Sequence, residues 1–278
     1  MWGINPPHTP YNSLKDCLEE DYVGYQGSAP ADLLVRPNAD TSLGKASRAG
    51  YYFASVTGVD RAFGHMLEAL EEWGLAQHTL VIFSSDYGEM MCSQGVVEPS
   101  NSPYIESMNV PFLVRYPGKL SPRVEHMLLS SPDIMLTLLG LAGLGELVPP
   151  TVQGRDLASF FFGENVQAKP PPGVLYLQNM DGDKDAQGLV RDYIPLARGW
   201  KTHRYTLALR IDRRDHSLIK SLFFDDLHDP YQQVNLSLSD HPEIVKELCW
   251  QMGQKLKEIE DPWYTERVLG DLIAYEAD

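Results

Sequence analysis

The sequence predicts an α/β fold followed by a small C-terminal α+β domain of antiparallel sheet and helix. Two apolar segments rich in β-branched and aromatic residues, 80–83 and 110–114, are predicted to be buried strands on either side of a polar loop. Amphipathic helical patterns cover residues 47–73 and 131–142. A proline-rich stretch at 169–173 precedes short strand-like segments and a last helix.

Composition limits the classes of partner. The chain has 278 residues, of which 43% are hydrophobic and 22% charged, which is enough for one large or two modest domains. Its formal charge of -15 opposes general binding to nucleic acid or anionic lipid, although a local basic pocket for an anionic substrate is compatible with it. No apolar run approaches the roughly 20 residues that span a bilayer. We therefore expect neither a nucleic-acid nor a membrane partner, and the first residues show no signal-peptide pattern.

The three cysteines, Cys17, Cys92 and Cys249, are an odd number without C-x-x-C spacing, which indicates neither a disulfide framework nor a zinc site. Cys92 follows the polar loop and invites interpretation as a nucleophile. A small packed thiol is the better interpretation, because nothing in the sequence indicates a lowered pKa for Cys92.

A proline-rich leader opens the chain at Pro6-Pro7-His8-Thr9-Pro10. Prolines fix φ and remove amide donors, so the leader is predicted to be a stiffened loop and not a helix. Such a loop can hold His8 at a fixed place, and taken alone the pattern favours a surface histidine. Residues 12–46 have no sustained period and are predicted to be irregular, with short helical turns.

The helix predicted from Ser47 to about Trp73 carries apolar residues at spacings of three, four and seven, and Gly74 is predicted to end it. Asp60 on this helix is predicted to have a surface or packing role and not to be a ligand. The apolar residues are Phe53, Val56, Phe63, Leu67 and Leu70.

Asp86 comes directly after the first predicted strand. In open α/β sheets ligands collect outside the carboxyl ends of strands, so this carboxylate is placed to meet a ligand or a metal. A strand-end aspartate that accepts amides of the following turn explains it equally well. Glu89 and Glu106 are predicted to be structural, because hydrogen bonds from loop amides would account for them.

After the second strand, Ser131-Pro132-Asp133 is typical of a helix start. Beyond the proline-rich stretch, three strand-like segments and an amphipathic helix predict a compact antiparallel sheet with one helix. The strands are expected at 174–179, 204–211 and 221–225, and the helix at 241–260. We place the domain boundary between residues 165 and 166, giving domains 1–165 and 166–278.

The run VDRAFGHMLEALEEWGLAQHTLVIFSSDYGE, followed by PYIESMNVPFLVRYPG, resembles the sulfatase family of the alkaline phosphatase superfamily. That family typically shows V-D-x-x-x-G, S-D-H-G-E and then P-Y-x-E-S-x-x-V-P-F-x-x-R-x-P-G. Two flanks also fit, NPPHTP at 5–10 and LHDPYQQVNL at 227–236. The resemblance covers nearly the whole chain, but only the C-terminal part of a full sulfatase. It implies a layered α/β/α sandwich and a periplasmic or secreted protein.

The resemblance also implies an activity. Sulfatases hydrolyse sulfate esters with a formylglycine made from Cys or Ser in a C/S-x-P-x-R motif, beside a calcium ion that neutralises sulfate oxygens and activates the attacking hydroxyl. By this resemblance His8 is catalytic, contacting the sulfate or protonating the leaving group. Asp86 is a metal ligand. The expected partner is a sulfated small molecule or glycan.

The chain departs from the family pattern at several positions. No nucleophile motif is present, and the closest match, Ser130-Ser131-Pro132-Asp133-Ile134, has isoleucine where arginine is required. The family's pair of N-terminal aspartates would lie upstream of Met1. Tyr87 replaces a histidine or asparagine beside Asp86, and Gln94 replaces a histidine that often precedes glycine. Asn101 lies where a sulfate-binding lysine is expected, and could donate one hydrogen bond to substrate.

Two interpretations of function follow. In the first, this is the C-terminal part of a sulfuric ester hydrolase with a depleted active site, inactive as the chain alone. In the second, it is a non-catalytic pseudo-sulfatase that acts as a binding or interaction protein. A hydrolase of phosphate or phosphonate esters is a third, less favoured option. Calcium needs about six to eight oxygen ligands, and one carboxylate is identified, so calcium binding by this chain is expected to be weak or absent.

Overall fold

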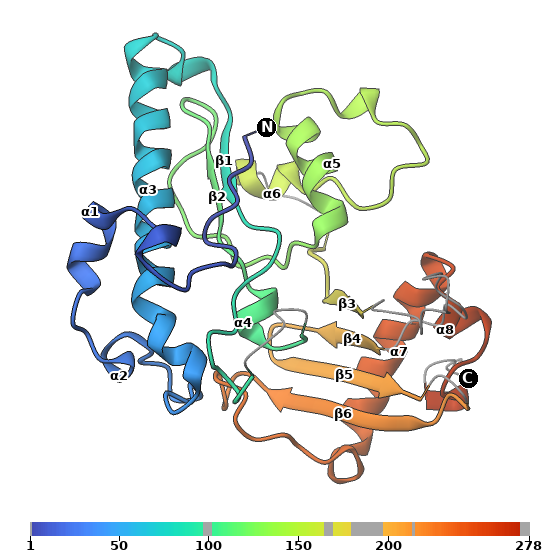
Figure 1. Ribbon diagram of the computed structural model, residues 1–278. Helices are drawn as coiled ribbons and strands as arrows, with labels where there is room; N and C mark the ends of the chain where they lie inside the picture. Colours follow the sequence, from blue (N-terminus) through green and yellow to red (C-terminus); the bar gives the residue numbers. More distant parts are fainter. Residues whose placement is uncertain (1, 97–101, 164–168, 179–196, 213–214, 273–278) are drawn as a thin grey trace, which may run out of the picture. The chain divides into compact units, whose positions relative to one another are not determined.

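A computed structural model describes residues 2–96, 102–163, 169–178, 197–212 and 215–272 (Figure 1). The chain divides into two compact units. The first comprises Met1–Ser100 and Ile105–Ser121, and the second Asn101–Tyr104 and Pro122–Asp278. The domain boundary predicted at 165/166 falls outside the described residues and stays a prediction.

The first unit is organised along the long helix α3 (Ala49–Glu72), which confirms the helix predicted at 47–73. The segment before α3 is a series of short turns, as expected, and α1 and α2 lie against α3 (Figure 1). The short elements are η1 (Leu14–Asp16), α1 (Glu19–Tyr22), η2 (Val23–Tyr25), α2 (Pro30–Leu33) and η3 (Gly44–Arg48).

A close approach holds α1 to α3. Arg61 on α3 donates to the buried carboxylate of Asp21 on α1 with a 2.9 Å bond between Nη2 and Oδ2. A Cβ at Gly58 would lie 2.8 Å from Asp21 Oδ2, so glycine is what permits this approach. The neighbouring Asp60 is exposed on the helix surface, in line with its predicted role.

Strands β1 (Val81–Ser84) and β2 (Phe112–Arg115) confirm the two predicted strands to within two residues. The predicted burial does not hold in the described structure, where β1 has one buried residue, Val81, and β2 has none. They pair antiparallel, with Val81 opposite Arg115 and Ser84 opposite Phe112. The ring of Phe83 packs on that of Phe63 with 4.9 Å between centroids, which fixes the strand pair on α3. The turn η4 (Ala76–His78) leads into β1, and α4 (Ile105–Met108) precedes β2.

In the second unit, α5 (Ser131–Leu141) begins at the predicted position. Asp133 in its first turn accepts hydrogen bonds from the amides of Ser130, at 3.1 Å, and Arg155, at 2.9 Å. Asp156 accepts the amide of Ala158 at the start of α6 (Ala158–Phe162). The segment Gly154-Arg155-Asp156-Leu157 therefore caps α6 and connects it to the first turn of α5. The turn η5 (Gly145–Leu147) connects the two.

The same unit contains a four-stranded antiparallel sheet in the order β3-β4-β5-β6. The helix α7 (Pro242–Glu258) covers one face of it (Figure 1). The core between them includes Trp200, Leu207, Phe223, Leu248, Met252 and Trp263. The strands are β3 (Val174–Gln178), β4 (Ala197–Lys201), β5 (Tyr205–Ile211) and β6 (Leu218–Asp225). The remaining elements are η6 (Leu238–Asp240), α8 (Pro262–Thr265) and η7 (Gly270–Leu272).

Strand β4 was not predicted. Its sequence, ARGWK, places Arg198 and Gly199 where strand patterns have apolar residues. The structure explains the arginine, because the guanidinium of Arg198 is 1% exposed and donates to Asp261 through Nε at 3.0 Å and Nη2 at 2.7 Å. A long-range ion pair therefore makes a charged residue suitable for the sheet interior.

The closing motif at 227–236 is structural. The side chain of Asn235 accepts the amide of Phe223 at 2.8 Å and donates to the carbonyl of Ser221 at 3.1 Å. The amide of Leu236 donates to the carbonyl of Phe223. These bonds occupy backbone groups on the outer edge of β6, which protects that edge from pairing with other chains.

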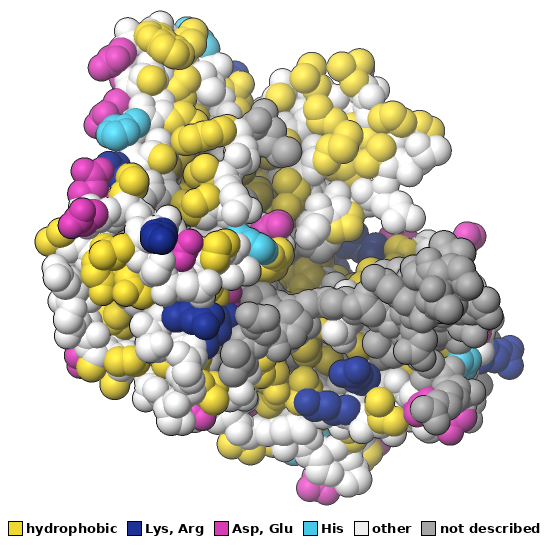
Figure 2. All heavy atoms as spheres, viewed as in Figure 1, with side chains coloured by type: hydrophobic (Ala, Val, Ile, Leu, Met, Phe, Trp, Pro, Cys, Tyr) yellow, Lys and Arg dark blue, Asp and Glu magenta, His cyan; other side chains and the backbone are white. Residues whose placement is uncertain are grey.

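The surface of the first unit reflects the acidic composition. Figure 2 shows acidic side chains along the side formed by α3, where Asp60, Glu68, Glu71 and Glu72 are exposed. None of the helices in the described part of the chain has the combination of length and apolar character that a bilayer crossing requires.

Candidate active site

The leader presents His8 to solvent. The amide of His8 donates to the carbonyl of Asn5 at 2.9 Å, which closes a turn. The ring atom Nδ1 lies 2.7 Å from the carbonyl oxygen of Thr9. Because a carbonyl oxygen only accepts, Nδ1 carries a proton in this bond, and Nε2 is the atom left for other chemistry.

The loop after β1 presents Asp86 to solvent as well. Its Oδ1 accepts the amide of Tyr87 at 3.1 Å, and Ser85 Oγ donates to the carbonyl of Tyr87 at 2.8 Å. The turn interpretation of Asp86 therefore accounts for one hydrogen bond to one of its oxygens. Within the described part of the chain, the carboxylate is otherwise exposed to solvent.

The leader and the Asp86 loop meet in space. The ring of His8 lies edge-on to the ring of Tyr87, with centroids 6.5 Å apart and planes at 76°. Because Tyr87 follows Asp86 directly, the structure brings together two segments that are almost eighty residues apart in sequence. The roles assigned to His8 and Asp86 remain predictions. Asn101 lies outside the described residues.

Glu106 on α4 is a structural anchor beside this loop. Its Oε1 accepts from Asn38 Nδ2 at 2.7 Å and from Arg36 Nη2 at 2.9 Å, and its side chain is 4% exposed. It therefore ties α4 to the segment before α3. The structural role predicted for Glu106 matches these contacts, although the donors are side chains and not loop amides.

Glu89 makes a second anchor. It accepts the hydroxyl of Tyr11 at 2.9 Å, the ammonium of Lys45 at 3.1 Å and the amide of Met91 at 3.1 Å. Burial raises the pKa of the nearby Tyr52 to about 12, and the charge of Glu89 adds to this shift. Sequence reasoning missed Lys45 and Tyr11, which gave no local signal in an irregular stretch.

Cys92 is a packed thiol, as predicted. Its side chain is fully buried and is not in a disulfide. Burial raises the pKa of the Cys92 thiol, an effect that the nearby Lys45 partly opposes. A thiol that resists ionisation is a poor nucleophile, so Cys92 has no part in the candidate site.

The described residues supply only one of the ligands that a calcium site requires. Among the described residues, no group of three or more His, Cys, Asp or Glu side chains is arranged to hold a metal ion. Asp86 offers one carboxylate, whereas calcium takes about six to eight oxygen ligands. The described residues alone therefore do not fit a calcium ion.

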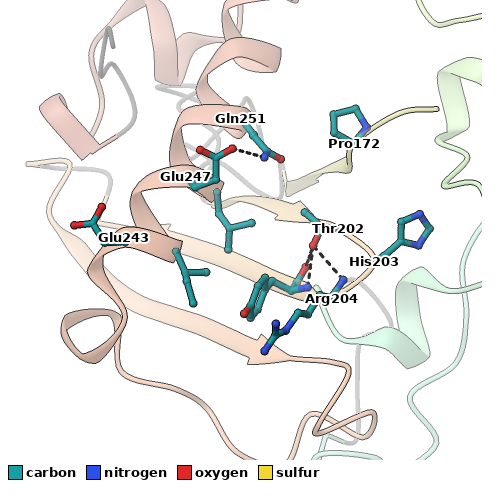
Figure 3. A pocket seen from close by; sticks show the side chains of 10 residues that line it. Pro172, Thr202, His203, Arg204, Glu243, Glu247 and Gln251 are labelled. Atoms are coloured by element: carbon teal, nitrogen blue, oxygen red, sulfur yellow. Dashed lines mark hydrogen bonds between the residues drawn. The ribbon is translucent and has the colours of Figure 1, made fainter. Parts of the chain in front are cut away.

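The second unit contains an open hollow of about 520 Å³ between the β4–β5 turn and α7 (Figure 3). Its polar groups are largely engaged within the protein. Thr202 Oγ1 accepts the amides of Arg204 and Tyr205, and Gln251 donates to Glu247. The guanidinium of Arg204 is held by Asp225. This hollow offers few free donors to a ligand.

The helices and antiparallel strands are consistent with an α/β protein of the alkaline phosphatase-like class. The sulfatase family profile matches residues 2–144. The chain is 58% identical over 275 residues to an endo-4-O-sulfatase of Bacteroides thetaiotaomicron, covering 99% of this chain and 54% of the relative. It is 31% identical over 274 residues to an ulvan-active sulfatase of Formosa agariphila, covering 93% of this chain and 48% of the relative. The chain belongs to the sulfatase family.

Solved structures agree on the fold. A Bacteroides thetaiotaomicron structure from work on the metabolism of multiple glycosaminoglycans matches with a TM-score of 0.96 and 58% identity, covering 98% of this chain and 56% of that one. The predicted fold class is confirmed by this similarity. The chain spans about half the length of the curated relatives it matches. Neither the family match nor these relatives support the non-catalytic alternative.

Proposed function

We propose that this chain forms part of a sulfatase that hydrolyses 4-O-sulfate esters of a sulfated glycan. The observation that supports the proposal is the contact between the ring of His8 and the ring of Tyr87, the residue after Asp86, with the side chains of both His8 and Asp86 exposed to solvent. The choice of the 4-O ester rests on the 58% identity to an endo-4-O-sulfatase.

In this proposal His8 acts on the leaving oxygen. Cleavage of a sulfate ester leaves an alkoxide on the sugar, which needs a proton. Since Nδ1 donates to the carbonyl of Thr9, the protonated ring presents its second N–H at Nε2. That proton is the one to be transferred. The neutral ring presents a lone pair there, so catalysis requires His8 to be protonated before the ester breaks.

Asp86 is proposed to supply one oxygen ligand to the calcium ion of the family, and Asn101 to donate a hydrogen bond to the substrate. The remaining calcium ligands are not found among the described residues. We therefore expect the purified 278-residue chain to bind calcium weakly and to release no sulfate by itself. Titration calorimetry and an aryl sulfate assay measure these two expectations.

The proposal is tested on the protein as its gene encodes it. Purified protein is incubated with chondroitin-type oligosaccharides that carry one sulfate, at the 4-O or the 6-O position, and released sulfate is measured by ion chromatography. We expect release from the 4-O ester at least about tenfold faster than from the 6-O ester, because a pocket that hydrogen-bonds one ester leaves those groups unpaired with the other. Faster release from the 6-O ester would contradict the assignment of the substrate. If sulfate is released from neither ester, the alternative interpretation of a non-catalytic binding or interaction protein would be favoured.

A further inference from the structure

Glu89 is the centre of a buried cluster that no catalytic role requires. Its carboxylate joins the hydroxyl of Tyr11 and the ammonium of Lys45, with bonds of 2.9 Å and 3.1 Å. Tyr11 is 1% exposed, and the side chains of Lys45 and Glu89 are 6% and 18% exposed. Lys45 Nζ also lies 5.5 Å from the centroid of the Tyr11 ring, so all three side chains contact one another.

Burying this ion pair has an energetic cost. Removing two charges from water costs several kcal/mol per ion, and apolar residues of similar volume often stabilise such a place as well or better. The cluster is therefore not explained by stability alone. Its best-supported use is to specify one arrangement of the segments it joins.

The cluster joins the two segments of the candidate active site. Tyr11 is three residues after His8, and Glu89 is three residues after Asp86. Three residues of extended chain span about 10 Å, so the Tyr11–Glu89 bond limits how far the two loops can separate. Close to the functional side chains, the His8–Tyr87 ring contact is the second connection between the loops.

We propose that Tyr11, Glu89 and Lys45 are positioning residues that hold His8 in register with the Asp86 loop. None of the three is a catalytic residue in this proposal, because Tyr11 and Lys45 are buried and Glu89 is only 18% exposed. Lys45 neutralises Glu89, and Glu89 holds the leader through Tyr11. The proposal relies on the proposed function for what His8 does, but not for how its ring is held.

The experiment replaces the Tyr11 hydroxyl alone. Tyr11→Phe removes the hydrogen bond to Glu89 and leaves the Lys45–Glu89 pair in place. Tyr25→Phe is the matched control, because Tyr25 makes a hydroxyl bond of 2.7 Å to Thr57 on α3 in the same unit. Two readouts are taken, kcat and KM for sulfate release by the protein as its gene encodes it, and the imidazole NMR signal of His8, assigned with His8→Gln.

We expect Tyr11→Phe to lower kcat about tenfold or more with KM nearly unchanged, since small misplacement of a catalytic group is costly. The His8 signal should shift in Tyr11→Phe and stay in place in Tyr25→Phe, while the two variants lose similar thermal stability. An unchanged His8 signal in Tyr11→Phe would overturn the proposal whatever the activity. If the wild-type protein releases no sulfate but the His8 signal still shifts in Tyr11→Phe, the positioning role is supported and the proposed function is refuted.

Discussion

The backbone of Gly88 lies directly against the backbone of Glu106. The amide of Gly88 donates to the carbonyl of Ser107 at 2.8 Å, and a Cβ built on Gly88 would lie 1.9 Å from the carbonyl oxygen of Glu106. No side chain fits in that space. The glycine after the Asp86–Tyr87 pair is therefore required by close packing of the loop on α4.

This relationship predicts the effect of adding one methyl group. Gly88→Ala should destabilise the protein by about 1–3 kcal/mol through overpacking, and should lower activity by displacing Asp86. Gly64→Ala on α3 is the control, because a Cβ there meets nothing within 4 Å. That change should stabilise the helix by about 0.5–1 kcal/mol. Urea unfolding measures the change in stability of each of the two variants. Equal changes in Gly88→Ala and Gly64→Ala would refute the packing argument.

The buried pair between Arg198 and Asp261 predicts a large loss of stability. Arg198→Met leaves the 6% exposed carboxylate of Asp261 without its charge partner, which should cost about 3–5 kcal/mol in the free energy of unfolding. Lys255→Met removes one partner of the more exposed Lys255–Glu258 pair and should cost at most about 1 kcal/mol. If chemical denaturation gives similar values for the two variants, the ion pair is not what keeps Arg198 inside the sheet.

The buried phenol of Tyr176 leads us to expect that the stability of the protein depends on pH in the alkaline range. Burial raises the pKa of its phenol to about 12, an effect that nearby Arg210 partly offsets. The unfolded phenol ionises near pH 10. Between about pH 10 and 12 the unfolded state therefore loses a proton that the folded state keeps, and stability falls as pH rises.

Tyr176→Phe should reduce that fall. The buried Tyr176 hydroxyl makes no hydrogen bond in the described structure, so its removal should be neutral or slightly stabilising at pH 7. Tyr52→Phe in the other unit should act in the same direction at high pH, because the pKa of Tyr52 is also raised to about 12. Unfolding free energies at pH 7 and pH 11 measure the change. An unaltered pH dependence in both variants would contradict the assignment.

Periodic segments could be predicted from the sequence, whereas long-range polar pairs could not. The helices α3 and α7 carry apolar residues at helical spacing, which is a local property. Strand β4 was missed because Arg198 depends on Asp261, 63 residues away. No local pattern reports such a partner.

The candidate site shows the same division. His8 and Asp86 could be nominated because each lies in a recognisable motif. Lys45 could not, because its role depends on Glu89, 44 residues away. The bond from Tyr11 to Glu89 spans 78 residues. These contacts exist only once the leader and η3 have folded onto the loop after β1.

The central claim is that His8 and Asp86 serve one sulfate ester site. Its most direct test, made in the protein as its gene encodes it, is the rate of 4-O-sulfate release by His8→Ala, Asp86→Ala and the double variant, beside His65→Ala and Asp60→Ala at exposed positions of α3. Each site variant should lose at least about 100-fold in kcat, with the double variant close to the worse single one because the groups act as a unit. The α3 variants should stay within about twofold. Retention of wild-type kcat by either His8→Ala or Asp86→Ala would contradict the account.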